Sequence, residues 1–322
     1  MSIKSEVVLN KTQTRKRRFK DIPIILWGLI GLIVILGFVS PNSIIPTHLL
    51  DFTRQAAPLI IAGIGQTLVL LIGGLDLSVG AVMILIDVIA AQLMQNDPTK
   101  VGFALVVCVA VGILVGFANG IMCAKLRMPS FIVTLGMSIL LQGIMLIYCQ
   151  GAPGGSIPDS FRTLGVGFVG PLPMALFVWV IIAAVVIVIL KLFPIGRYIV
   201  ATGVNERAVY QSGLNPIKIK LFCYMMCGLL SALAGLQIAA YIGTGVLELG
   251  VDYQMQSIAV ALLGGAAFSG GKGSIPGTIL AGLFIVVMLS LIAALNMSAG
   301  DQSIVQGIII LAALLINGLK KE

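Results

Sequence analysis

Gly73-Gly74-Leu75-Asp76-Leu77-Ser78-Val79-Gly80 interrupts what is otherwise one apolar run from Gln55 to Asn96. Consecutive glycines can end a helix in a left-handed turn without the steric cost of a Cβ atom. Asp76 or Ser78 can then cap the next helix, because its first N–H groups lack partners and its dipole favours a negative charge. The stretch therefore predicts two membrane helices that meet in a tight polar turn.

Such a break has functional meaning in a membrane protein. Irregular backbone at membrane depth is tolerated only where protein or a water-filled cavity surrounds it, and it is typical of transporters. We therefore interpret the stretch as a hinge and expect its conformation to depend on Gly73, Gly74, Asp76, Ser78 and Gly80. For Asp76 the simpler interpretation is a helix cap; the alternative is a gate or a contact along the transport pathway.

The composition indicates an all-α polytopic membrane protein. The chain has 322 residues, of which 59% are hydrophobic and 10% charged, whereas soluble proteins contain about 25% charged residues. The net charge of +8 does not indicate nucleic-acid binding, because the basic residues lie beside apolar runs. With one histidine, His48, and five cysteines that all fall in apolar runs, the sequence indicates no catalytic, metal or cofactor site.

About 20 apolar residues cross a bilayer core, so the chain can be divided into spans at charges and turn residues. This division predicts ten spans, namely Ile22–Ser40, Gln55–Ile72, Leu77–Gln95, Val101–Ala124, Pro129–Cys149, Pro171–Leu192, Leu221–Ile242, Tyr253–Ser269, Ile275–Asn296 and Ser303–Leu319. Spans eight and nine are separated by Gly264-Gly265 and Gly270-Gly271-Lys272-Gly273, so we expect two glycine-broken helical hairpins. If they form a repeat, the permeation route is expected where the broken helices meet.

The basic residues predict the orientation. All of the 20 Lys and Arg residues except Arg54, Lys100 and Arg162 fall in segments that this division places on one side. The positive-inside rule then makes both termini cytoplasmic. The predicted organisation is a basic N-terminal segment (1–21), a transmembrane permease domain (22–319) with an inner loop (193–220), and a short cytoplasmic tail (320–322).

Two loops are long. The outer loop Gly151–Gly170 is rich in glycine and proline, and we expect it to be irregular. The inner loop contains Asn205–Gly213, which reads as a short helix with Asn205 as its N-cap, Gly213 as its stop and Pro216 beyond. Such a helix can lie along the membrane surface, or it can dock a cytoplasmic subunit.

At these residues the sequence resembles the membrane permeases of ATP-binding cassette importers for sugars, of the ribose, xylose and autoinducer-2 type. The matching motifs occur in the same order over roughly residues 22–320: Gly74–Gly80, Pro129–Gly136, Gly196–Gly203, Ser212–Asn215 with Lys218–Lys220, and Leu263–Gly265 with Gly270–Gly273. The family's coupling consensus, Glu-Ala-Ala with a downstream glycine, is matched only loosely by Glu206-Arg207-Ala208 and Gly213.

The resemblance implies a multi-pass protein of the bacterial plasma (inner) membrane, surrounded by lipid, that works in an assembly. Its partners are a second permease copy or a related permease, cytoplasmic ATP-binding cassette ATPases, and an external sugar-binding protein. The sequence agrees with this division of labour, because it contains no Gly-x-x-x-x-Gly-Lys-Ser/Thr phosphate loop. ATP hydrolysis must then come from a partner, and the chain itself is not an enzyme.

A neutral sugar needs a pathway with a few hydrogen-bonding groups. The candidates for its lining are Gln66, Thr67, Asp87, Asn119, Ser138, Gln142, Gln256, Ser257 and Asn296. An ionised carboxylate at mid-bilayer costs about 2.5–3.5 kcal/mol, so Asp87 should face protein or water. The alternative role for the amides and hydroxyls is helix–helix contact, worth about 0.6 kcal/mol each. The candidates for ATPase coupling are Asn205, Glu206, Arg207, Tyr210, Ser212 and Gly213.

Two other functions stay open at this point. One is a permease of a branched-chain amino acid importer, whose family shares the same broad architecture. The other is a secondary transporter driven by protons or sodium, with Asp76 and Asp87 as ion sites. The match at Leu75–Gly80 favours the sugar importer.

Overall fold

The computed structural model of the chain describes residues 24–298, 300–305 and 307–308. The predicted basic segment 1–21, most of the tenth span Ser303–Leu319 and the tail 320–322 lie outside these residues. Within the described part the chain is helical apart from turns, loops and one two-stranded antiparallel hairpin, in which Phe168 pairs with Pro173. This agrees with the predicted all-α membrane protein.

The elements occur in the following order along the chain: α2 (Ile24–Val39), η1 (Pro41–Ile44), α3 (Pro46–Gln55), α4 (Ala57–Leu71), α5 (Val79–Met94), η2 (Pro98–Lys100), α6 (Val101–Gly120), η3 (Ile121–Lys125), α7 (Ser130–Tyr148), α8 (Asp159–Val166), β1 (Phe168–Val169), β2 (Leu172–Pro173), α9 (Met174–Leu192), α10 (Pro194–Val204), α11 (Glu206–Gln211), α12 (Pro216–Ile242), α13 (Gly250–Leu263) and α14 (Ile275–Ala294). Among the described residues five helical segments are long and apolar enough to cross a membrane. The pair α3 and α4, bent by 44°, would add a sixth.

Several predicted spans have shifted ends, for local reasons. α12 begins five residues before the predicted Leu221, because the side chain of Asn215 accepts the N–H groups of Ile217 and Lys218 and Pro216 fits the first turn. α13 ends six residues before the predicted Ser269, since Gly264-Gly265 already terminate it. α9 begins at Met174 because the three residues before it belong to the β-hairpin and its turn.

The loop expected to be irregular, 151–170, is irregular over residues 151–158 but contains a helix further on. Residues Asp159–Val166 form α8, which packs on the C-terminal half of α12. The side-chain amide of Gln237 donates to the carbonyl of Leu164 (3.1 Å), and Gly165 lies so close to Ala240 that a Cβ atom would overlap its backbone. Tertiary packing therefore orders this loop although its own sequence is rich in turn residues.

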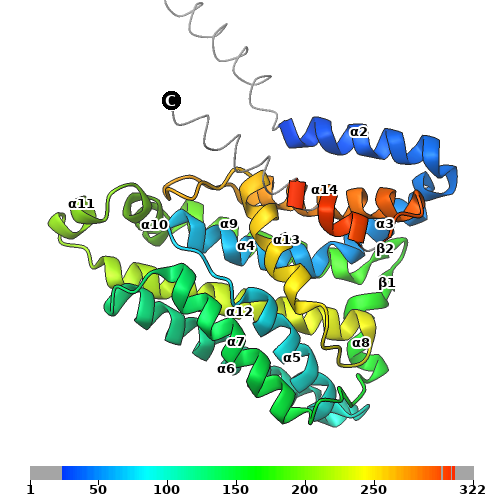
Figure 1. Cartoon of the computed structure of the whole chain (residues 1–322), viewed down its shortest axis with the longest axis horizontal. Helices are drawn as coiled ribbons and strands as arrows, with labels where there is room; N and C mark the ends of the chain where they lie inside the picture. Colours follow the sequence, from blue (N-terminus) through cyan, green and yellow to red (C-terminus); the bar gives the residue numbers. More distant parts are fainter. Residues whose placement is uncertain (1–23, 299, 306, 309–322) are drawn as a thin grey trace, which may run out of the picture.

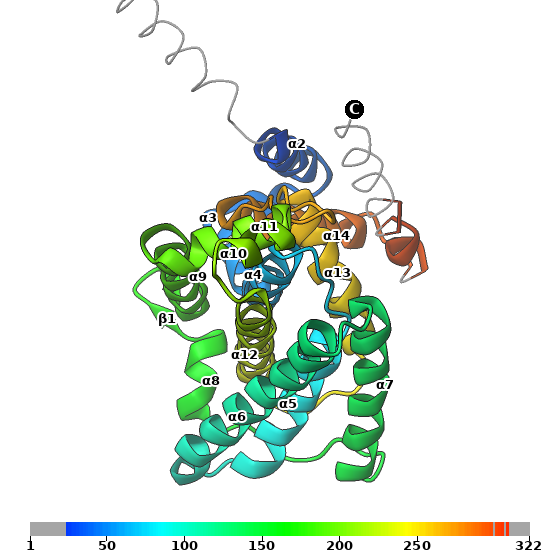
Figure 2. The ribbon, with the colours of Figure 1, turned by 90° about the vertical axis from the view of Figure 1, so that its left-hand side faces the viewer.

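α12 is the central helix of the molecule. It has its most extensive contacts with α6, α4 and α5, and Figure 2 shows it between α6 and α5 below and α4 above. Its contact with α6 is made by backbone rather than by large side chains. A Cβ atom added to Gly112 would lie 2.6 Å from the carbonyl oxygen of Gly228, and one added to Gly116 would overlap the carbonyl of Tyr224. Small residues at these positions let two membrane helices approach closely.

The turns between helices gather at two opposite ends of the molecule, as Figure 1 shows for α11 at one end and for α8 with the β-hairpin at the other. At the α8 end the N–H of Asn96 bonds to Ser156, and the N–H of Ile157 bonds to Gly243. At the α11 end the N–H of Gly271 bonds to Leu71. The segments predicted to be outer thus meet at one end, and those predicted to be inner meet at the other.

The glycine contact between α6 and α12 gives a first prediction. Gly116→Ala should lower the stability of the purified protein by about 1–3 kcal/mol, the usual cost of overpacking, because the new methyl group would overlap Tyr224. Gly136→Ala is the matched control, since nothing lies within 4 Å of a Cβ atom at that position of α7. Thermal unfolding in detergent measures both variants. Equal shifts of the melting temperature would contradict the packing argument.

Candidate functional site

The two glycine-broken helices end in the same way. In α4 the N–H of Gly73 bonds to the carbonyl of Leu70 (2.9 Å), and the N–H of Gly74 bonds to that of Val69 (3.0 Å). Gly73 has φ +74°, in the left-handed region. α13 ends with the same pair of bonds around Gly265, where φ is +96°. This pattern satisfies carbonyls that a helix end leaves free, and it favours glycine at the left-handed position.

The two glycine turns meet each other and the end of α10. The N–H of Gly271 donates to the carbonyl of Leu71 (2.8 Å), which joins the second broken segment to the first. Gly203, near the end of α10, lies at this junction: a Cβ atom there would overlap both the Leu71 carbonyl and the Gly271 nitrogen. The inner loop is therefore in direct backbone contact with both breaks.

Asp76 is buried, with 2% of its surface exposed, and it organises the start of α5. Its Oδ1 accepts the backbone N–H of Ser78 (2.8 Å) and the hydroxyl of Ser78 (2.6 Å). The Ser78 side chain makes no cap bond to α5 itself; its oxygen accepts a hydrogen bond from the Nδ2 of Asn119 in α6 (2.9 Å). The carboxylate thus closes a turn onto Ser78, the residue directly before α5.

Two more helices hold the same turn. From the first turns of α7, the hydroxyl of Ser130 accepts the N–H of Leu75 (3.2 Å), and that of Thr134 accepts the N–H of Leu77 (2.9 Å). From α12, the hydroxyl of Tyr224 lies against Gly74, where a Cβ atom would be 2.5 Å away. Sequence reasoning missed these three contacts. Ser130 and Thr134 share a helix face at i and i+4, but nothing local indicates that the turn lies beside them.

Gly80 belongs to a second close contact of the hinge. It lies in the first turn of α5, and a Cβ atom there would overlap the carbonyl of Gly250 in the first turn of α13. Helix α5, which follows the first glycine break, is thus in backbone contact with α13, which precedes the second. All five hinge candidates lie in or directly beside this packed turn.

The nine pathway candidates do not form one site. Asn119 belongs to the Asp76 group described above. The hydroxyl of Thr67 shares a hydrogen bond with Thr278 of α14 (2.8 Å). Gln66 is fully buried, and neither atom of its amide has a hydrogen-bond partner among the described residues.

Five other candidates differ in burial: Ser138 and Ser257 are buried, and the remaining three are not. Ser138 of α7 donates weakly to Gln254 of α13 (3.4 Å), which the sequence analysis did not single out, and Gln142 donates to Ser138 (3.3 Å). Ser257 is buried and bonds within its own helix. Gln142 and Asn296 are exposed, and Gln256 is half-buried.

Asp87 lies two turns into α5, with no exposed surface. Its Oδ2 accepts the backbone N–H of Val246 (2.8 Å), and its Oδ1 has no hydrogen-bond partner among the described residues. The carboxylate therefore faces protein, as its cost in lipid requires. It fixes the loop that joins α12 to α13.

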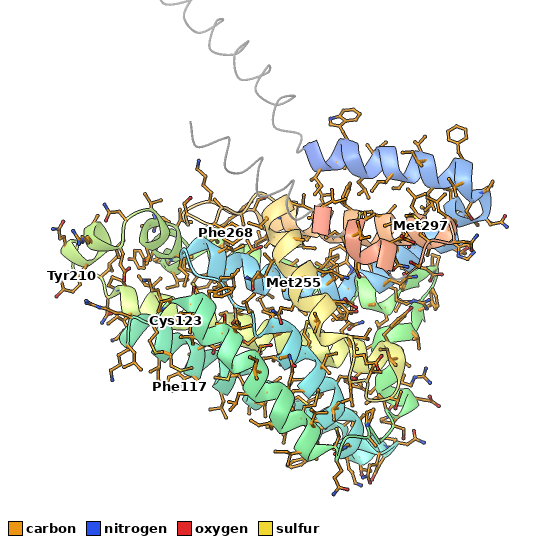
Figure 3. The ribbon with its side chains drawn as sticks, viewed as in Figure 1. Phe117, Cys123, Tyr210, Met255, Phe268 and Met297 are labelled. Atoms are coloured by element: carbon orange, nitrogen blue, oxygen red, sulfur yellow. The ribbon has the colours of Figure 1, made fainter. Side chains whose placement is uncertain are left out.

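The coupling candidates lie on the short helix α11, which projects at one end of the molecule, with Tyr210 at its tip in Figure 3. The side chain of Asn205 accepts the N–H of Ala208 (3.1 Å), so Asn205 is the N-cap, and Gly213 takes φ +81° at the stop. Glu206 forms an ion pair with Lys220 of α12 at 2.6 Å. Arg207, Tyr210 and Ser212 are exposed.

Comparison with known proteins places the chain in a family. The profile described as "Branched-chain amino acid transport system / permease component" matches residues 48–314. The chain is 36% identical to the ribose import permease protein RbsC of Haemophilus influenzae, over 91% of this chain and 93% of that protein. It is 32% identical to RbsC of Bacillus subtilis (91% of each), and 29% identical to the autoinducer 2 import system permease protein LsrC of Escherichia coli (91% and 85%). No solved structure matches it.

The chain belongs to this family of importer permeases. It is a multi-pass membrane protein and the permease subunit of an ATP-binding cassette importer, a transport component and not an enzyme. The resemblance seen in the motifs is thereby confirmed.

The geometry of Asp76 gives a second prediction. Asp76→Asn should keep assembly and most of the transport rate, because an amide oxygen can accept the same two bonds from Ser78. Asp76→Ala should reduce the yield of folded protein, since it leaves a buried N–H and a buried hydroxyl without their acceptor. Size-exclusion yield and uptake by membrane vesicles measure the two effects. Folded Asp76→Asn protein with abolished transport would favour the gate interpretation instead.

Proposed function

We propose that the chain passes a sugar, such as a pentose, a hexose or a related polyol or autoinducer, from an external binding protein to the cytoplasm. The relatives that match over nine-tenths of the chain are named for ribose and autoinducer 2 import, which supports a substrate of this class. The family description includes branched-chain amino acid permeases, but none of the three relatives cited here is named for an amino acid.

We propose the finer topology from the charges and the grouping of turns. Ten spans with both termini cytoplasmic place the α11 end inside, together with both glycine breaks, and the α8 end outside. The inner assignment is supported by the basic residues at that end, namely Lys125, Arg127, Arg197, Arg207, Lys218, Lys220 and Lys272. The working unit contains a second permease copy, cytoplasmic ATPases and the binding protein, as importers of this type require.

One observation carries the mechanism: the backbone contact of Gly203 with Leu71 and Gly271. The inner loop, which we propose reaches the ATPase through α11, is thereby packed on the end of α4 and on the glycine-rich segment between α13 and α14. A displacement of α11 that accompanies ATP binding has a short path to the two glycine turns. These turns are the positions at which the direction of the chain can change with little steric cost.

Alternating access then follows from movement at the turns. Helices α4 and α13 end there, and α5 and α14 begin just beyond, so a change at the Gly265 turn alters the angle between the packed helices α13 and α14, and a change at the Gly73 turn alters the direction of α5 relative to α4. The buried amide of Gln66 and the Thr67–Thr278 pair lie on helices that adjoin the turns. We propose these groups, and Ser138 with Gln254, as contacts along the pathway. Tight binding is left to the external protein.

Reconstitution tests the function. Permease purified with its ATPase and placed in liposomes should accumulate ribose only when ATP is inside and the binding protein is outside. A permease alone should not accumulate it under a proton or sodium gradient. Uptake driven by an ion gradient without ATP would establish the secondary transporter instead. Binding-protein-dependent uptake of leucine in place of ribose would establish the amino acid permease.

The junction at Gly203 gives a further prediction. Gly203→Ala should uncouple ATP hydrolysis from uptake in the reconstituted importer, because the methyl group forces α10 away from Leu71 and Gly271. Gly102→Ala is the control, since a Cβ atom there meets nothing within 4 Å. ATPase activity with and without binding protein, measured beside uptake, separates coupling from folding. Normal coupling in Gly203→Ala would remove this contact from the mechanism.

The exposed face of α11 can be tested in the same assay. The double variant Glu206→Ala, Arg207→Ala should insert normally and lose stimulation of the ATPase by the binding protein, because both residues are exposed on α11, at the end of the molecule that we propose faces the cytoplasm. Lys218→Ala, on the exposed first turn of α12, is the control for loss of charge. Unchanged stimulation in the double variant would show that neither side chain transmits the movement.

A further inference from the structure

A cavity of about 840 Å³ opens at the inner end of the molecule, between α11, the first turns of α12, the turn Ile72–Gly74 and the segment η3. Ser130, Tyr224 and Cys123 are among its lining residues, and Tyr224 is almost fully buried. Figure 3 shows Cys123 and, further out, Tyr210, both of which line it. The volume is in the range of sites for small molecules.

The charge of the cavity is positive. Arg127, Arg207 and Lys220 line it, each from a different segment, and Glu206 is the single acid among the described lining residues. Glu206 is already neutralised by Lys220, at 2.6 Å. Arg127 and Arg207 have no ion pair within the described residues. Two guanidinium groups thus stand at one cavity without a counter-charge from that part of the chain.

The backbone presents Arg127 in an uncommon way. α6 passes into the π-helical segment η3, and Arg127, two residues after its end, has φ +56°, a left-handed value that few side chains other than those of asparagine and aspartate adopt readily. Both π-helical turns and such backbone outliers occur frequently at functional sites. With this backbone conformation the helix does not continue through Arg127, and Arg127 lines the cavity.

We propose that this cavity binds a phosphate group through Arg127 and Arg207, with the hydroxyls of Tyr224 and Ser130 as further donors. Guanidinium groups pair with phosphate oxygens through two parallel hydrogen bonds, which suits a site with two of them. The phosphate belongs either to an anionic phospholipid of the inner leaflet or to a soluble phosphate ester. In either case the bound group links α11 to the glycine turn and so regulates how firmly the coupling helix is held.

The reactivity of the Cys123 thiol can report whether the cavity is occupied. It is half-buried and lines the cavity, whereas Cys108, Cys149, Cys223 and Cys227 are buried. Full-length permease in nanodiscs of phosphatidylcholine is treated with a small maleimide, and modification of Cys123 is followed by mass spectrometry. Inorganic phosphate should slow this modification several-fold, and sodium chloride at equal ionic strength should not. Gln211→Cys, an exposed position in the same cavity, provides a second thiol if Cys123 reacts too slowly.

Variants assign the effect to the two arginines. Arg207→Gln on the exposed helix α11, alone and together with Arg127→Gln, should abolish the protection by phosphate. Arg197→Gln removes an exposed inner-end cation that does not line the cavity, and it should keep the protection. Equal protection in Arg207→Gln, Arg127→Gln and in the unaltered chain would mean that the anion binds elsewhere, and the proposal would be wrong.

Lipid composition separates the two sources. Slow modification in phosphatidylglycerol nanodiscs without added phosphate, reversed by Arg127→Gln with Arg207→Gln, would identify a lipid headgroup. Protection by inorganic phosphate in phosphatidylcholine alone would identify a soluble ester. Protection by neither would overturn the proposal, as would protection that appears only when the ATPase is added. Because the measurement is thiol modification and not uptake, its outcome is independent of the transported substrate.

Discussion

The polar backbone groups that a break between two membrane helices leaves free are tolerated only where protein or a water-filled cavity surrounds them. This constraint determines the surroundings of the turn at Gly73. The last carbonyls of α4 are satisfied by the N–H groups of Gly73 and Gly74, and the N–H groups of Leu75 and Leu77 are satisfied by hydroxyls of α7. Asp76 accepts the next free N–H, that of Ser78. Helices α5, α6, α7 and α12 converge on this turn because the break requires them there.

The same constraint explains why the molecule is rich in close backbone contacts. A polar turn can be enclosed only if the surrounding helices approach to within a few ångströms of one another, which side chains larger than alanine prevent. Gly112 and Gly116 allow α6 to lie on α12, and Gly80 allows α5 to lie on α13. In a membrane this packing also replaces the hydrophobic driving force that would hold helices together in water. Close packing and the burial of Asp76 are therefore two aspects of one arrangement.

What the sequence predicts well is local. The breaks at Gly73 and Gly265, the cap at Asn205 and the start of α14 at Ile275 follow from neighbouring residues, and the structure has them at the predicted places. The partners of the candidate site residues do not follow from spacing. Thr67 meets Thr278, 211 positions away, and Ser138 meets Gln254, 116 positions away. Helix α8 is formed by packing on α12, a tertiary effect that overrides a loop-like composition. The family can therefore be identified from the motifs, whereas the contacts of the candidate site residues become known only from the fold.

The arrangement also indicates why hinge and coupling segment are adjacent. A turn whose backbone groups are hydrogen-bonded resists movement. A displacement of the neighbouring segment therefore reaches it only through contacts that are too stiff to absorb that displacement. Backbone-to-backbone contact is the stiffest that a protein offers, because no side-chain rotamer can absorb the displacement. Gly203 makes such a contact with both broken segments, whereas α11 is held by the buried side chain of Val209 and by the ion pair of Glu206 with Lys220 of α12, near the surface. In the proposed mechanism the surface attachment would let α11 follow a partner, and the backbone contact at Gly203 would pass the movement to the glycine turns. An anion bound between Arg127 and Arg207 would stiffen the surface attachment and so change the coupling without touching the pathway.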